Sequence, residues 1–331
     1  MKIGLGIRGN DRTNTLFLDY AAQIGVTDTI VFMPDKKIIP SAESHGYWSV
    51  EDLKALRRLY HEHHLEIDGF ENFDPRMWYK ILLDEPGKKM QMDNVKRCIE
   101  SMGKAGIKTM GYNFSIACVT GLHGGNYARG GAHTVRFTKT DEAVSTPFPL
   151  GWAWNHQVVD EPPAGVLDFI TKEQMYERRD YFLREIIPVA EEAGVVLAAH
   201  PEDPPIPELR AASRLLITPK DFEELLSTYN SKSIAVEFCQ GTFAEMGVDV
   251  YEQIRSFASR KKIAYVHFRN VKGTIPEYTE VFIDEGDTDM VEALKAYHES
   301  GYEGLLMPDH VPTISCANAT ETGMAHAIGY I

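Results

Sequence analysis

Short apolar runs alternate with longer segments of helical period along most of the chain. A compact apolar run predicts a strand, and a longer segment with apolar residues one turn apart predicts a helix. The expected strands are residues 3–6, 29–32, 66–70, 109–112, 195–199, 234–238, 263–268 and 305–307. The expected helices are residues 13–24, 50–61, 93–105, 172–193, 219–227, 249–259, 289–300 and 325–331. Eight such units in series predict an α/β protein with a closed (β/α)8 TIM barrel, and an open doubly wound sheet is the alternative.

Several of the expected helices carry boundary signals of their own. Ser49 is an expected N-cap, because its hydroxyl can accept a hydrogen bond from a free backbone N–H in the first turn. Gly106 and Gly194 stand just past the ends of two helices, where a left-handed backbone conformation favours glycine.

The alternation breaks after the fourth expected strand. Residues from about 114 to 171 are rich in Gly, Thr, Pro, His and aromatic residues, with little sustained periodicity. A loop of this length inside a compact domain usually carries function or covers a site. We therefore expect a single barrel domain over residues 1–331, with a long insertion after strand four.

Composition and charge narrow the classes of function. Hydrophobic residues make up 44% of the 331 residues, and the formal net charge is -14. That negative charge repels phosphate backbones, so we expect no nucleic-acid partner. We also expect no membrane span, because no apolar run is long enough to cross a bilayer. The widely spaced cysteines Cys98, Cys118, Cys239 and Cys316 form no C-x-x-C pair, which predicts reduced thiols and a cytoplasmic protein.

Four consecutive expected strands end in residues that can bind a metal ion. His200 follows the fifth strand, Cys239 the sixth, His267 lies at the end of the seventh and Asp309 follows the eighth. Residues at these ends of barrel strands face the mouth where active sites lie. A single histidine or cysteine on a strand more often serves the core, but four in succession indicate one shared ion. Mixed nitrogen, sulfur and oxygen ligands suit Mn2+, Fe2+ or Zn2+ better than Mg2+ or Ca2+.

Other polar residues fall on the same rim and could bind the carboxylate and hydroxyl groups of a substrate. They are Arg8, Asn10, Glu71, Asn72, Asn113, Arg269 and Asn270. An arginine fork is the natural partner of a carboxylate. Loop capping and surface solvation are the alternative roles for each of them. The run His61-Glu62-His63-His64 lacks the H-E-x-x-H spacing of a metalloprotease, because position 65 is leucine.

At these residues the sequence resembles the mannonate dehydratase family, which belongs to the xylose-isomerase-like TIM barrels. The resemblance lies in stretches spread over about two thirds of the chain. They are Ala105-Gly106-Ile107, Tyr112-Asn113-Phe114, Ala190-Glu191-Glu192-Ala193-Gly194, His200-Pro201-Glu202-Asp203-Pro204-Pro205, Phe238-Cys239-Gln240-Gly241, Val266-His267-Phe268-Arg269-Asn270-Val271, Asp287-Thr288-Asp289-Met290 and Pro308-Asp309-His310.

The resemblance implies a hydro-lyase that removes water from D-mannonate, giving 2-keto-3-deoxy-D-gluconate, with Mn2+ or Fe2+ as cofactor. The family's metal ligands match His200, Cys239, His267 and Asp309 one for one. The family also uses a tyrosine beyond the Pro-Asp-His motif in proton transfer. Met324 stands near its expected place, and Tyr330 is the only tyrosine after Asp309.

From these residues we predict His310 as an acid/base group, because the neighbouring Asp309 would be occupied as a ligand. Tyr330 is the candidate for the second proton transfer. Arg8, Glu71, Asn113, Arg269 and Asn270 are the expected substrate-binding residues. We also expect a homo-oligomer that acts on a small sugar acid. The alternatives are a sugar isomerase or epimerase on the same barrel, a barrel endonuclease, and a non-catalytic sugar-acid-binding protein.

Overall fold

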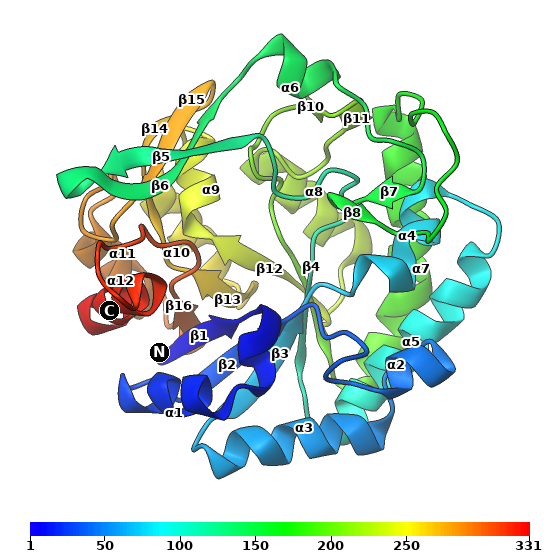
Figure 1. The fold of residues 1–331 in the computed structure, drawn as a ribbon, viewed down its shortest axis with the longest axis horizontal. Helices are drawn as coiled ribbons and strands as arrows, with labels where there is room; N and C mark the ends of the chain where they lie inside the picture. Colours follow the sequence, from blue (N-terminus) through cyan, green and yellow to red (C-terminus); the bar gives the residue numbers. More distant parts are fainter.

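Eight parallel strands close into a barrel, as the alternating pattern predicts. The computed structural model describes residues 1–331, apart from the side chains of residues 141 and 143. The strand order around the barrel is β1-β16-β13-β12-β9-β4-β3-β2, and Figure 1 shows helices surrounding these strands. The strands are β1 (Lys2–Ile7), β2 (Asp28–Phe32), β3 (Glu66–Glu71), β4 (Thr109–Tyr112), β9 (Val196–Ala199), β12 (Ile234–Cys239), β13 (Ile263–His267) and β16 (Leu305–Met307).

The outer helices are α1 (Thr15–Gln23), α3 (Val50–Glu62), α5 (Lys88–Ala105), α7 (Lys172–Ala193), α8 (Pro219–Tyr229), α10 (Val250–Ser259), α11 (Met290–Glu299) and α12 (Ala319–Tyr330). Six of the outer helices begin and end close to the residues that the sequence predicts, whereas α5 and α12 begin five and six residues earlier than expected. The side chain of Ser49 accepts a hydrogen bond from the N–H of Asp52, which confirms the predicted N-cap. Gly106 and Gly194 have φ angles of 80° and 67°, the left-handed conformation expected at these ends.

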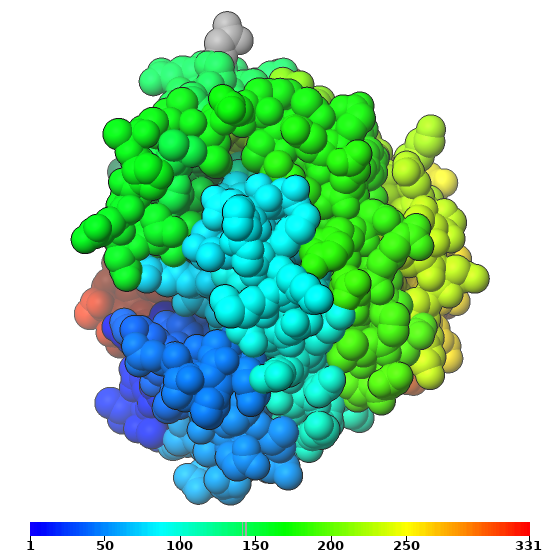
Figure 2. Space-filling view, turned by 90° about the vertical axis from the view of Figure 1, so that its right-hand side faces the viewer, coloured from blue at the N-terminus to red at the C-terminus, as the bar shows by residue number. Residues whose placement is uncertain are grey.

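Further short helices lie outside the predicted pattern. They are the 3-10 helices η1 (Gly9–Thr13) and η2 (Arg129–Gly131), and α2 (Ser41–His45), α4 (Pro75–Leu83), α6 (Asp141–Ser145) and α9 (Gln240–Glu245). Helix α4 packs against α5 and α7, and Figure 2 shows α4 and α5, in cyan, beside α7, in green. Most residues of α4 are buried, among them Trp78, Ile81 and Leu82.

The insertion contains more regular structure than its sequence indicates. Strands β5 (Leu122–Ala128) and β6 (Ala132–Thr138) form a hairpin, and β6 pairs with a second hairpin made of β14 (Asn270–Thr274) and β15 (Glu277–Val281). Four antiparallel strands therefore join segments that are far apart in the sequence. The facing residues Phe137 and Tyr278 are both buried, which stabilises the pairing. The remaining short strands are β7 (Trp152–Ala153), β8 (His156–Gln157), β10 (Glu208–Leu209) and β11 (Ala212–Ser213).

The core has two layers. A large apolar cluster fills the space between the strands and the outer helices. A smaller cluster fills the interior of the barrel and consists of Ile30, Phe32, Ala198, Tyr265, Leu305 and Met307. The barrel is therefore a packed core, and its functional residues lie at one end of it. Among the described residues, no helix is both long and apolar enough to cross a membrane.

Candidate metal centre

His200 follows β9 and is fixed in one orientation by the backbone beside it. Its Nδ1 lies 2.6 Å from the carbonyl oxygen of Pro201, and the side-chain amide of Asn113 donates to the same carbonyl oxygen over 2.9 Å. The residue is only 6% exposed. A hydrogen bond from Nδ1–H leaves the lone pair of Nε2 available to a metal ion. Asn113, predicted to bind substrate, thus also supports the loop that carries His200.

Cys239 is the last residue of β12 and is completely buried. Burial alone would oppose ionisation of its thiol. The cationic Arg269 and the imidazoles of His200 and His267 overcome that effect and hold the pKa of Cys239 well below its ordinary value. A thiolate is the form of cysteine that binds metal ions. The hydroxyl of Thr242 also donates to its sulfur over 3.1 Å.

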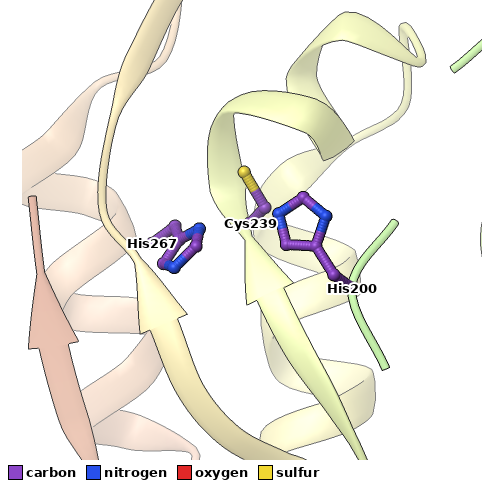
Figure 3. A group of neighbouring side chains, drawn as sticks. All are labelled: His200, Cys239 and His267. Atoms are coloured by element: carbon purple, nitrogen blue, oxygen red, sulfur yellow. The ribbon is translucent and has the colours of Figure 1, made fainter. Parts of the chain in front are cut away.

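His267 ends β13 and faces charged groups through both ring nitrogens. Its Nε2 lies 3.1 Å from Glu71 and 3.2 Å from Glu237, measured to carboxylate oxygens. Its Nδ1 is buried and has no hydrogen-bond partner among the described residues. Figure 3 shows that the side chains of His200, Cys239 and His267 point toward one another from three neighbouring segments. Their ligand atoms lie within 4.8 Å of one another, close enough to hold one metal ion.

Asp309, two residues after β16, lies at the edge of this trio. Its Oδ2 is 3.5 Å from Nδ1 of His267, and its Oδ1 accepts a hydrogen bond from Arg8. Burial would raise its pKa, but His310, His267 and the nearby arginines hold it well below the ordinary value. The carboxylate is therefore ionised and directed at the unpartnered nitrogen of His267.

The raised pKa values of the two imidazoles indicate that this site favours positive charge. Burial lowers the pKa of His200, but Glu237 and Cys239 together raise it to about 9. Burial also opposes protonation of His267, and Asp309 with Glu71 and Glu237 raises its pKa well above the ordinary value. Protons thus supply positive charge where anionic ligands converge. A divalent cation would replace those protons, so the residues present fit a metal ion.

A cavity of about 230 Å³ opens beside these side chains. The sequence-predicted residues that line it are Arg8, Glu71, Asn72, Asn113, His200, His267, Asp309 and His310. The insertion supplies part of the opposite wall through Cys118, Val119, Trp154, Asn155 and His156. Arg8 lies over the ring of Phe32, with 3.7 Å between the guanidinium carbon and the ring centroid, at the mouth of the cavity. The insertion therefore helps to enclose whatever binds here.

His310 is held by a residue that the sequence analysis did not identify. Its Nδ1 lies 2.9 Å from Oε1 of Glu280, which is 3% exposed and belongs to β15. Burial lowers the pKa of His310, but Asp309 and Glu280 raise it to about 8. Glu280 escaped detection because its hairpin was not predicted, so nothing in the sequence placed it near the strand ends.

Among the predicted site residues, Cys239, Arg269, Asn270 and Tyr330 do not line this cavity. The guanidinium of Arg269 bonds Asp203 and Glu245 at 2.6 Å and 2.7 Å, so buried ion pairs occupy it. The side-chain amide of Asn270 donates to the carbonyl oxygens of Ile283 and Thr288, and thereby joins two loops. Tyr330 is the last residue of α12, is 36% exposed and does not line the cavity.

Two further buried polar residues face the barrel interior. Glu237 lies two positions before Cys239, and Tyr265 two positions before His267. Because strand residues two apart share a face, this spacing could have identified both. The hydroxyl of Tyr265 donates to Glu71 over 3.1 Å. Burial and the neighbouring Glu71 raise the pKa of Glu237 to about 8.

A closed parallel barrel whose strand ends direct nitrogen, sulfur and oxygen donors at a cavity is typical of barrel enzymes that bind a divalent metal ion. Comparison with known proteins gives the particular family. A sequence model of D-mannonate dehydratase (UxuA) matches residues 1–329. The chain belongs to the mannonate dehydratase family, whose members are hydro-lyases.

Individual relatives agree with this assignment. The chain is 30% identical to mannonate dehydratase 2 of Halalkalibacterium halodurans over 278 residues, covering 80% of this chain and 79% of that protein. It is 28% identical to the mannonate dehydratase of Thermotoga maritima, covering 91% and 86% of the two chains. The crystal structure of mannonate dehydratase from Streptococcus suis has a TM-score of 0.81 at 24% identity, covering 100% of this chain and 91% of that one.

More distant structures share the barrel. D-psicose 3-epimerase from Clostridium cellulolyticum has a TM-score of 0.59 at 13% identity and covers 99% of this chain and 96% of that one. At that identity the likeness concerns the fold alone. Family membership therefore favours dehydration of a sugar acid over the isomerase or epimerase alternative.

Proposed function

We propose that the protein removes water from D-mannonate to give 2-keto-3-deoxy-D-gluconate. The observation that supports this most directly is the meeting of His200, Cys239 and His267 within 4.8 Å, in a chain of the mannonate dehydratase family. The adjoining cavity has Arg8 and His310 on its wall, so it offers a cation for a carboxylate and a group that transfers protons.

The proposed ligands of the metal ion are His200, Cys239, His267 and Asp309. A bound Mn2+ or Fe2+, with Zn2+ as the alternative, would act as a Lewis acid that stabilises negative charge developing on the substrate carboxylate and its neighbouring oxygen. Arg8 already donates to Asp309, so its guanidinium lies where it can also bind the substrate carboxylate. Asn113 and Glu71 line the same cavity.

Dehydration requires two proton movements. The proton on the carbon beside the carboxylate must leave, and the departing β-hydroxyl must gain one to leave as water. His310 is the proposed acid/base group for one of these movements, because it lines the cavity and has a pKa raised to about 8. Its Nδ1 faces Glu280, which leaves Nε2 as the nitrogen that exchanges a proton with substrate. Tyr330, the sequence-based candidate for the second movement, does not line the cavity.

The deciding experiment is an assay of D-mannonate turnover, measured by the appearance of an α-keto acid. We expect activity that disappears after treatment with a chelator and returns with Mn2+ or Fe2+. His310→Asn should retain bound metal and lose turnover by about 10²–10⁴-fold. His298→Asn, on the exposed face of α11, is the control and should keep full activity. Formation of an isomeric sugar without an α-keto acid would instead support the isomerase alternative.

Three further properties remain predictions from the sequence: a homo-oligomeric state, a cytoplasmic location and the absence of a nucleic-acid partner.

A further inference from the structure

Nε2 of His267 lies against a buried acidic pair, Glu71 and Glu237. Oε2 of Glu71 is 3.1 Å from Nε2 of His267 and also accepts a hydrogen bond from Tyr265. Oε1 of Glu237 is 3.2 Å from the same nitrogen. Glu71 and Glu237 are 4% and 0% exposed. Neither oxygen of Glu237 has a hydrogen-bond partner among the described residues.

We infer that Glu71 is a positioning residue for the metal centre and not a substrate ligand. It accepts the Nε2–H of His267 and thereby fixes the tautomer whose Nδ1 lone pair faces Asp309, 3.5 Å away. A neutral imidazole has one N–H and one lone pair, so a hydrogen bond at one nitrogen decides which nitrogen can bind a metal ion. This inference rests on the proposed function, because it assumes that the trio binds a metal ion.

The packing of the barrel interior explains how the acidic pair fits there. Glu71 ends β3, Glu237 lies on β12 and Tyr265 lies on β13, so three strands contribute. On β4, the residue facing them is Gly111. A Cβ at Gly111 would stand 2.6 Å from Oε2 of Glu237 and would overlap the hydroxyl of Tyr265. The missing side chain on β4 therefore provides the space that the two polar groups occupy.

A second metal ion between Glu71, Glu237 and His267 is the competing interpretation, because these ligand atoms also lie within 4.8 Å of one another. With both sites filled, His267 would have to bind one ion through each nitrogen and give up both ring protons. A single ion needs only the neutral ring. The geometry therefore favours an acceptor for Nε2–H over a second ion.

Nitrogen NMR of the wild-type protein tests the tautomer directly. We would label histidine with 15N and load the protein with Zn2+, which is diamagnetic. We expect one Zn2+ per chain, with Nδ1 of His267 bound to the ion and Nε2 carrying a proton. Zn2+ bound through Nε2, or two Zn2+ ions per chain, would overturn the inference while leaving a metal centre in place. A wild-type protein that binds neither Zn2+ nor Mn2+ would refute the proposed function itself.

Calorimetric titration of Zn2+ into variants of residue 71 tests the energetic role. Glu71→Leu should weaken Zn2+ binding by about 10–100-fold, as is typical when the hydrogen-bond partner of a metal-binding histidine is removed. Glu71→Gln keeps an acceptor oxygen and should recover part of that loss, with Nε2 still protonated in the NMR spectrum. Glu299→Gln, on the exposed side of α11, is the control. Unchanged affinity in a folded Glu71→Leu protein would contradict the inference. If that variant does not fold, the wild-type tautomer and Glu71→Gln decide.

Discussion

At the scale of single residues, the candidate centre places side chains of opposite charge close together. The thiol of Cys239 ionises easily, whereas the imidazoles of His200 and His267 retain their protons. The pKa shift of each group depends on the other two, because all three groups are buried and lie within a few ångströms of one another. Removing one member therefore changes the protonation of the rest as well as the number of ligands.

Replacing the sulfur ligand tests the centre most simply. Cys239→Ser should lower metal content and reduce turnover by more than about 100-fold, since even the outer partners of metal ligands contribute up to that amount. Cys316→Ser alters an exposed thiol and should keep both properties. Metal analysis and the α-keto acid assay measure the two effects. Full metal content in Cys239→Ser would exclude the thiol as a ligand.

Removing the charge of Glu280 tests how His310 is held. In Glu280→Gln we expect a lower kcat at unchanged metal content, because the imidazole loses the carboxylate that orients it. The pKa of His310 should also fall, since a nearby negative charge favours the imidazolium form. The limb of the pH–rate profile that reports His310 should therefore move to lower pH: the basic limb if His310 acts as an acid, the acidic limb if it acts as a base. A profile identical to that of the wild-type protein would show that Glu280 does not act through His310.

At the scale of elements, the sequence predicted the barrel strands and outer helices because their apolar periodicity is strong. Helix α7 and strand β16 have the predicted boundaries. The hairpin of β14 and β15 was missed because its residues are stabilised by pairing with β6, a partner more than a hundred residues away. Glu280 was missed with it. Arg269 and Asn270 were predicted to bind substrate because they follow a strand. A position after a strand does not show which buried group the side chain will contact.

The capping box of α7 is an element whose contribution can be measured. The hydroxyl of Thr171 accepts from the N–H of Gln174, and the side chain of Gln174 accepts from the N–H of Thr171. Thr171→Ala should reduce the free energy of unfolding by about 1 kcal/mol, because an N–H at the helix start loses its partner. Urea unfolding with an unchanged m-value would attribute the loss to stability alone. No change in the midpoint would mean that water replaces the hydroxyl at no cost.

At the scale of the whole molecule, the metal ion should stabilise the fold. The proposed ligands come from β12, β13 and the segments after β9 and β16, so one ion would link four parts of the barrel. A ligand at 100 times its Kd stabilises the folded state by about 2.7 kcal/mol. Chelator treatment should therefore lower the Tm of the wild-type protein and leave that of Cys239→Ser almost unchanged. Equal shifts in both proteins would place the stabilising ion elsewhere.

The pairing of β1 with β16 has a consequence for the time course of synthesis. Lys2 and Ile3 pair with Leu305 and Leu306, so the first barrel strand to be synthesised cannot pair with this neighbour until the last barrel strand has been made. Until then the nascent sheet has two open edges, and exposed edges can pair with other chains. A growing chain of this protein should therefore be most prone to aggregation just before its final strand emerges.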